Sequence, residues 1–119
     1  MRNFRELIVW QKSHSLALDI YKLSRNFPRD EVFGLTSQIK RAAASVPTNI
    51  AEGCGRSTDA DFARFLHIAA GSACEVEYQL LLAHDLGFIE ANEYSILNER
   101  INEIKKMLAG FTQRLKSNR

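Results

Sequence analysis

The sequence predicts an all-α protein: an antiparallel up-down-up-down four-helix bundle with a kinked second helix, formed by one domain over residues 1–119. Three observations predict this fold. Apolar residues recur with alternating three-and-four spacing in four successive segments. The connections between these segments are short, which favours antiparallel neighbours. Sustained period-two alternation and Asn-Gly or Asp-Gly turns, the signals of strands, are absent.

The first segment carries two neighbouring apolar stripes, one through Trp10 and His14 and one through Leu16 and Ile20. Two stripes imply that this helix contacts more than one neighbour. Phe27-Pro28 ends it, because the residue before a proline is pushed out of the helical conformation.

The second segment has an apolar stripe from Leu35 to Ile50 and ends at Gly53-Cys54-Gly55. Pro47 lies inside the stripe, where it removes one backbone hydrogen bond and crowds the carbonyl of Ala43. We therefore expect a kinked helix with a local polar repair. A break into two helices is the competing interpretation.

The third helix is expected over residues 59–86, with Thr58 and Asp61 resembling a capping box at its start and Gly87 ending it. At about 1.5 Å per residue it would be ~42 Å long, which suits a bundle.

The fourth segment has the most regular heptad pattern of the chain. Its apolar stripe runs from Tyr94 to Leu115, and Asn92 is expected to be its N-cap.

Residues that could carry catalytic or metal chemistry are not spaced for it. None of the three histidines has a carboxylate three residues before it, as an inward-facing di-iron site in a bundle requires. The spacing of Cys54 and Cys74 matches neither a zinc site nor a redox pair, and Gly53-Cys54-Gly55 lacks the lysine of a phosphate-binding loop. We expect no enzyme activity, no metal and no cofactor.

The apolar runs are all too short to span a bilayer, and the N-terminal segment does not resemble a signal peptide. We expect a cytoplasmic protein with no membrane contact.

A polar row follows the apolar face of the second helix within about 80° of arc. Because such side chains are costly to bury without partners, we expect them to bond to another helix or another subunit, with Arg41 and Glu75 as an ion pair. A ligand pocket lined by Arg41, Asn49 and Glu52 is the alternative. The row contains Gln38, Arg41, Ser45, Asn49 and Glu52, and the third helix contributes Ser72, Glu75 and Gln79.

Small residues occupy the centres of both middle helices, at Ala42-Ala43-Ala44-Ser45 and Ala69-Ala70-Gly71-Ser72-Ala73, so their backbones can approach closely. The third helix also carries Leu66, Ile68, Leu81 and Leu82 outside its main stripe. A monomer cannot easily cover that surface, which indicates self-association.

Charge is distributed unevenly along a chain of net charge +2. Residues 1–25 carry +3, residues 26–58 carry +1, residues 59–88 carry −4 and residues 89–119 carry +2. The acidic third helix is suited to basic surfaces within an oligomer, and the basic ends are suited to phosphate, with solvated termini as the plain alternative. The candidate nucleic-acid residues are Arg2, Arg5, Lys12, Lys105, Lys106, Arg114, Lys116 and Arg119.

Taken together, these residues resemble the bacterial four-helix-bundle proteins also called 23S rRNA intervening-sequence proteins. The similarity covers nearly the whole chain, and its most specific part is Ser45-Val46-Pro47-Thr48-Asn49-Ile50-Ala51-Glu52-Gly53. The other matching features are Val9-Trp10-Gln11-Lys12, Tyr21, Phe27-Pro28, Leu35-Thr36-Ser37-Gln38-Ile39-Lys40-Arg41-Ala42, Phe62, Phe65, and Gly71-Ser72 with Glu75. The resemblance implies a ring-shaped homopentamer and supplies no catalytic residues.

The leading hypothesis is a non-enzymatic, ring-forming bundle that binds RNA or a ribonucleoprotein through its basic helix ends. A protein-interaction scaffold without nucleic-acid binding is the alternative. A small-molecule binder or enzyme built on the Arg41, Asn49 and Glu52 row is the second alternative.

Overall fold

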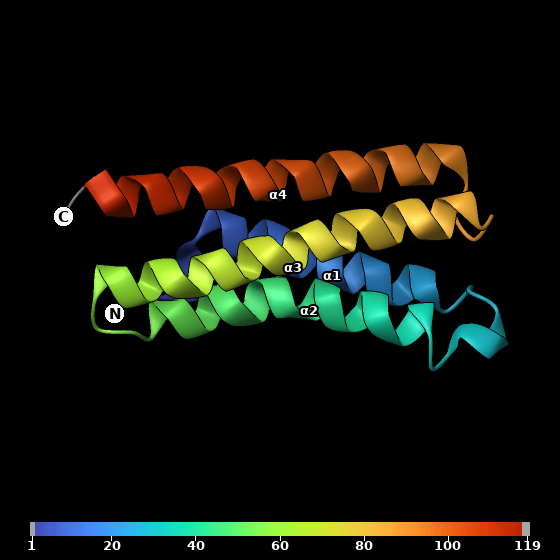
Figure 1. Cartoon of the computed structure of the whole chain (residues 1–119), viewed down its shortest axis with the longest axis horizontal. Coiled ribbons are helices and arrows are strands. Elements are labelled where there is room, and N and C mark those ends of the chain that lie inside the picture. Colours follow the sequence, from blue (N-terminus) through green and yellow to red (C-terminus); the bar gives the residue numbers. More distant parts are fainter. Residues whose placement is uncertain (1, 118–119) are drawn as a thin grey trace.

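The computed structural model describes residues 2–117, which form four α-helices and two short 3-10 turns (Figure 1). In chain order these are η1 (Phe4–Glu6), α1 (Ile8–Ser24), η2 (Arg29–Glu31), α2 (Leu35–Cys54), α3 (Asp59–Asp85) and α4 (Ala91–Ser117). Successive helices run in opposite directions along a body of 47 × 23 × 20 Å. None of the described residues lies in a strand, so the predicted four-helix bundle is confirmed.

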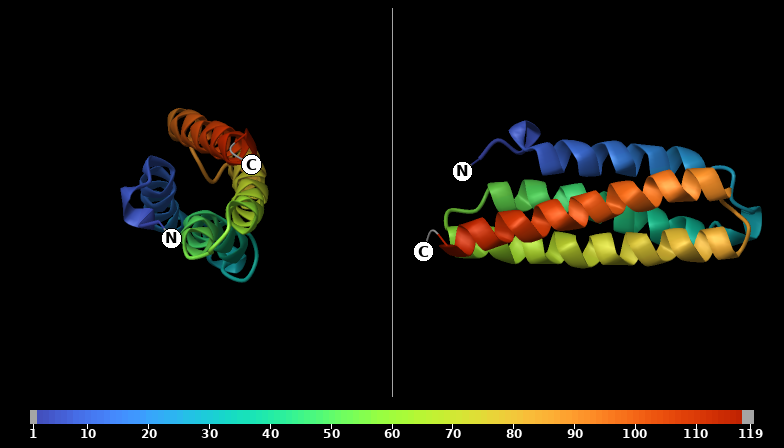
Figure 2. Two further views of the ribbon diagram at one scale, coloured as in Figure 1. Left: turned by 90° about the vertical axis from the view of Figure 1, so that its left-hand side faces the viewer. Right: turned by 90° about the horizontal axis from the view of Figure 1, so that it is seen from above.

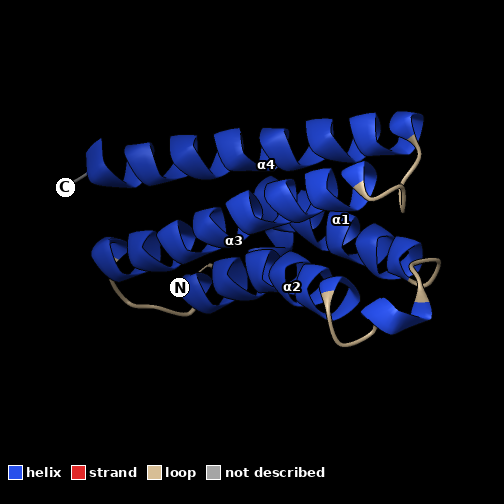
Figure 3. Ribbon diagram, turned by 45° about the vertical axis from the view of Figure 1, so that its right-hand side comes forward, coloured by secondary structure: helices blue, strands red, loops and turns tan. Residues whose placement is uncertain are grey.

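The helices form an arc when the bundle is viewed along its length (Figure 2, left). The α2–α3 contact is the most extensive, followed by α3–α4 and α1–α2, whereas α1 and α4 touch least. Aliphatic side chains from all four helices fill the interior, with Ile20, Ile39, Leu80 and Leu108 fully buried. The connections lie at the two ends of the bundle (Figure 3).

α3 begins and ends where the sequence predicts. The Thr58 side chain accepts a hydrogen bond from the backbone N–H of Asp61 at 3.1 Å, which satisfies one free donor of the first turn. Gly87 adopts φ +84° just past the helix, a conformation that other residues rarely adopt.

α4 begins two residues earlier than predicted, because an N-cap at Asn92 would make Glu93 the first helical residue. The N–H of Tyr94 donates to the carbonyl of Glu90 at 2.9 Å, so the helix starts at Ala91 and Asn92 lies within its first turn. The prediction that Asn92 is the N-cap is wrong, because the backbone of Glu90 already closes the first helical hydrogen bond.

α2 runs through Pro47 without interruption, so the alternative of two separate helices is wrong. Val46 and Ile50 are buried on either side of the proline, and their burial holds both halves against one core. The Asn49 amide donates to the carbonyl of Ser45 at 2.8 Å, which places a polar side chain beside the proline turn. That contact is not the predicted repair, because the carbonyl that Pro47 leaves without its helical donor is that of Ala43.

The N-terminal segment is tied to the end of α2. The N–H of Arg2 donates to the carbonyl of Cys54 at 3.0 Å, and the side chain of Asn3 accepts from the N–H of Arg5 at 3.1 Å. These bonds hold η1 beside the α2–α3 connection. Since α4 also ends here, both termini lie at one end of the bundle (Figure 1).

Candidate nucleic-acid interface

Five arginines gather at the end of the bundle that holds both termini. Arg2 and Arg5 come from the N-terminal segment, Arg114 from the end of α4, Arg56 from the α2–α3 connection and Arg64 from the start of α3. No sequence signal places Arg56 and Arg64 here, because only the folded chain brings the α2–α3 connection beside the N-terminal segment and the end of α4.

Each of these guanidinium groups lies over an aromatic ring. Such stacking holds the planar group in one orientation while leaving its opposite face accessible. The distances from guanidinium carbon to ring centre are 4.7 Å for Arg2 on Phe62, 4.6 Å for Arg5 on Phe4, 4.6 Å for Arg56 and for Arg64 on Phe65, and 5.5 Å for Arg114 on Phe111.

Carboxylates compensate several of the basic side chains at this end. Arg2 pairs with Asp59 at 3.8 Å, and Arg64 pairs with Asp61 at 3.0 Å. Arg56 lies 3.8 Å from the same Asp61. A compensated cation attracts phosphate less strongly, so this arginine group is less positive than its composition indicates.

Two predicted candidates farther from this end are also paired. Lys12 Nζ lies 2.9 Å from Glu103 on α4, and Lys105 Nζ lies 2.6 Å from Glu77 on α3. The hydrogen bond between Lys105 and Glu77 lowers the pKa of the carboxyl group and raises the pKa of the ammonium group. Both lysines therefore serve contacts between helices.

The other candidates stay uncompensated within the part of the chain that the structure describes. Arg5, Lys106, Arg114 and Lys116 form no ion pair with any carboxylate there, whereas Arg119 lies outside the described residues.

Lys106 and Arg114 line one groove of about 380 Å³ between the start of α1 and the end of α4. Its remaining lining is mostly apolar, from residues such as Leu7, Ile8 and Phe111. Free cations suit this groove to a phosphate backbone, whereas the ring of Phe111 already has Arg114 and Arg2 over it.

The polar row meets across α2 and α3 at its centre. The hydroxyl groups of Ser45 and Ser72 lie 2.8 Å apart, and the Asn49 amide also donates to the Ser45 hydroxyl at 3.0 Å. Serine side chains bridge the two helices because the adjacent small residues Ala42 and Ala69 let the backbones approach closely.

The predicted ion pair between Arg41 and Glu75 is wrong for the single chain. The structure has no ion pair between them within 4.0 Å. Both side chains are exposed and line one groove of about 530 Å³, together with Gln38. The close approach of the helices brings the serines together and leaves the longer side chains at the rim, in contact with water.

Glu52, at the end of the polar row, turns away from it. Its carboxylate lies 3.5 Å from Arg56 one turn later, and its side chain is half exposed. Arg41, Asn49 and Glu52 thus do not converge on one pocket, because only Arg41 lines the rim groove.

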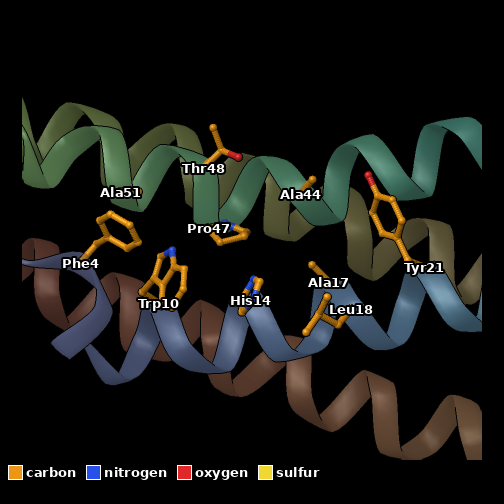
Figure 4. A pocket seen from close by; sticks show the side chains of 10 residues that line it. All are labelled: Phe4, Trp10, His14, Ala17, Leu18, Tyr21, Ala44, Pro47, Thr48 and Ala51. Carbon is orange, nitrogen blue, oxygen red and sulfur yellow. The ribbon is translucent and has the colours of Figure 1, made fainter.

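A third groove, between α1 and α2, is open and apolar (Figure 4). Its volume is about 480 Å³. Trp10 stacks on His14 with ring centres 4.8 Å apart and meets the edge of Phe4 at 4.9 Å. No lining residue is a carboxylate; the lining consists of Phe4, Trp10, His14, Ala17, Leu18, Tyr21, Ala44, Pro47, Thr48 and Ala51.

Residues 2–117 contain no group of three His, Cys, Asp or Glu side chains placed to hold a metal ion. Burial raises the pKa of the Cys54 thiol, which favours its protonated, unreactive form. None of the helices in this range is long and apolar enough to cross a bilayer.

Comparison with known proteins gives one consistent result. A family model described as 23S rRNA-intervening sequence protein matches residues 5–110. A crystal structure from Bacteroides thetaiotaomicron, described as a protein with unknown function from the S23 ribosomal protein family, superposes with a TM-score of 0.80 at 32% sequence identity. That alignment covers 88% of this chain and 98% of the other. No curated protein matches.

Proposed function

The chain belongs to the 23S rRNA-intervening sequence protein family, and from this premise we propose that it is a non-enzymatic, ring-forming bundle, a homopentamer, that binds RNA or a ribonucleoprotein. Binding uses the basic end of each subunit, around the groove between α1 and α4. Neither the family nor its solved member carries an assigned activity in its description.

The groove lined by Lys106 and Arg114 is the observation that carries the RNA proposal. Both cations lack a carboxylate partner among the described residues, and Phe111 lies beside them with Arg114 over its ring at 5.5 Å. Arg5 and Lys116 add free charge at the same end. A closed ring would repeat this patch in every subunit, so that a modest charge becomes a multivalent one.

Exposed apolar side chains on α3 support assembly. Ile68 is 42% exposed, Tyr78 60% and Leu81 40% in the single chain. Large apolar side chains that gather along one helix are typical of a protein that associates with copies of itself or with other proteins.

The RNA proposal is tested by the double substitution Lys106→Glu with Arg114→Glu, measured by filter binding of total RNA over a salt series. The wild-type protein should bind at low salt and lose affinity steeply as salt rises, since binding releases counterions from the phosphates and added salt makes that release less favourable. The variant should bind at least about tenfold more weakly, and its salt dependence should be shallower by one to two released ions.

The matched control is Lys22→Glu with Arg25→Glu. It makes the same change of charge near the end of α1, at the opposite end of the bundle, on two exposed side chains. Equal losses in both variants would reduce the effect to net charge and contradict a specific interface. Absence of RNA binding at low salt would contradict the proposal altogether.

The alternative function is a protein-interaction scaffold. The apolar groove between α1 and α2 favours it, because a groove of about 480 Å³ that includes Trp10 and Tyr21 is suited to a protein surface rather than to phosphate. A nuclease-resistant pulldown that recovers protein partners and no nucleic acid would favour the scaffold.

A further inference from the structure

Two apolar surfaces on different sides of the chain have no partner within it. One is the groove between α1 and α2, hereafter the α1–α2 groove. The other is the outer face of α3, hereafter the α3 ridge, defined by Ile68, Gly71, Tyr78 and Leu81. The three large side chains of the ridge are 42%, 60% and 40% exposed.

We propose that the α3 ridge of one copy of this chain docks into the α1–α2 groove of a second copy. The proposal rests on the ring assembly proposed above and identifies the surfaces that form it. Since groove and ridge share no residue, each copy offers one of each, and the contact can repeat head to tail until a ring closes.

The dimensions of the two surfaces agree. The ridge from Ile68 to Leu81 spans about 20 Å at ~1.5 Å per residue, and the groove wall from Trp10 to Tyr21 spans about 16 Å. An apolar helix face seated between two helices is a common mode of recognition, with anchors at successive turns.

The charges at the two surfaces are complementary. Beside the groove, Lys40 lies over the ring of Tyr21 at 5.0 Å and Arg5 over the ring of Phe4 at 4.6 Å. On α3, Glu75 and Asp85 are exposed and form no ion pair among the described residues. Docking brings unpaired carboxylates to a groove that has Arg5 and Lys40 beside it and no carboxylate in its lining.

Gly71 is a second, independent observation. It lies in the middle of α3 and is exposed, where glycine costs about 1 kcal/mol relative to alanine. A Cβ added at Gly71 would meet nothing within 4 Å, so the chain's own fold does not require a glycine here. Close approach of a second copy's backbone does require one.

Trp10 provides a local reporter, because it is the only tryptophan of the chain and it lines the groove. Docking excludes water from the indole. Its emission should therefore shift to shorter wavelength over the same protein concentrations at which light scattering shows the mass rising.

The ridge and the groove are tested by Gly71→Arg and Leu18→Asp. Gly71→Arg fills open space with bulk and a cation that the basic groove edge repels, and it improves helix propensity, so the fold persists. Leu18→Asp puts a carboxylate on a half-exposed groove position, against Glu75 and Asp85 of the incoming copy.

Each variant should associate with itself at least tenfold more weakly than the wild-type protein. Ala109→Arg and Ile96→Asp make matched changes at exposed positions of α4 and should leave association unchanged.

Mixing the two variants gives the decisive result. Gly71→Arg retains an intact groove and Leu18→Asp an intact ridge, so an equimolar mixture should form a 1:1 dimer that grows no further. If both single variants still assembled into the ring that the wild-type protein forms, or if their mixture stayed monomeric, this docking would be overturned although the ring assembly itself would stand. A monomeric wild-type protein would overturn the ring itself.

Discussion

The two long sides of α2 behave differently although both carry small residues. Towards α3, Ser45 and Ser72 touch at 2.8 Å, and a groove remains only outside this contact, at the rim lined by Arg41 and Glu75. Towards α1, Ala44 and Ala51 face an open groove of about 480 Å³. One short run of sequence supplies both sides, so small residues on one helix do not by themselves bring a neighbour close.

The neighbouring helix decides the outcome. α3 presents Ala69 and Ala73, both fully buried, so nothing keeps the two backbones apart. α1 presents Trp10, His14 and Tyr21, whose rings hold its backbone away from α2 (Figure 4). A tight contact needs small residues on both helices, and a groove forms where only one helix has them.

Substitution at Gly53 should disturb the closed side most. A Cβ added there would lie 2.8 Å from Cδ1 of Phe62 and 2.9 Å from Cβ of Phe65, closer than real contacts allow. Gly53→Ala should lower the free energy of unfolding by about 1–3 kcal/mol, because the start of α3 must move away. Urea unfolding followed by circular dichroism measures the loss.

Gly71→Ala is the matched control, since it adds the same methyl group to α3 where nothing lies within 4 Å. It should stabilise the chain by up to about 1 kcal/mol through helix propensity. If both substitutions changed the free energy of unfolding in the same direction, the close approach at Gly53 would not be what restricts the α2–α3 contact.

On the open side, Trp10→Ala removes a whole indole and should cost no more than one added carbon at Gly53, because the ring is only half-buried. Trp10 loses its stacking on His14 and its edge contact with Phe4, worth about 1.5 kcal/mol together, in addition to the apolar area that the ring buries. The measurement is urea unfolding at dilutions where light scattering shows monomer. A loss larger than that of Gly53→Ala would mean that the groove side, not the closed side, carries the fold.

Substitutions at Ser45 and Ser72 test whether the contact between their hydroxyl groups stabilises the packing of α2 against α3. Ser45→Ala and Ser72→Ala should each cost about 1 kcal/mol, and the double variant should cost less than the sum, because the two share one hydrogen bond. Ser95→Ala, at an exposed position of α4, is the control and should not destabilise. Strict additivity would contradict a contact between the two hydroxyls.

The fold followed from the sequence because its signals are local. Apolar periodicity, the Thr58 cap and Gly87 each act within a few residues, and each is confirmed as a helix or helix boundary. The end of the first helix is less accurate, because α1 ends at Ser24, three residues before Phe27-Pro28. The continuity of α2 through Pro47 was left open, since burial against the whole core decides it.

The contacts of the candidate site residues were less predictable from the sequence than the helices, because they depend on distances between helices. Arg41 and Glu75 have suitable charge and register, yet the two serines approach so closely that the longer side chains remain at the rim. Likewise, net charge per segment identified Lys105 as a phosphate candidate but gave no sign that Glu77 would pair with it. The groove beside Trp10 has no sequence signal, since its residues belong to apolar stripes that predict burial.

The contact between α3 and α4 differs from both sides of α2, because an ion pair between Lys105 and Glu77 crosses it. Lys105→Met removes the bond of 2.6 Å to Glu77 and should lower the free energy of unfolding at neutral pH by less than about 1 kcal/mol, since both side chains are partly exposed. The pKa of Glu77 is held below its usual 4.5, so its contribution is complete above that pH and is lost as pH falls through the folded pKa. The pKa of Lys105 is raised above 10.5, so the same contribution is lost again as alkaline pH passes the folded value. Urea unfolding at about pH 7 and about pH 3 should therefore show a difference between wild type and variant that narrows in acid. Lys106→Met, one residue away and without a described carboxylate partner, is the control and should show no such pH dependence. If its free energy of unfolding did depend on pH in the same way, the effect would come from net charge. The α3–α4 contact would then rest on apolar packing alone.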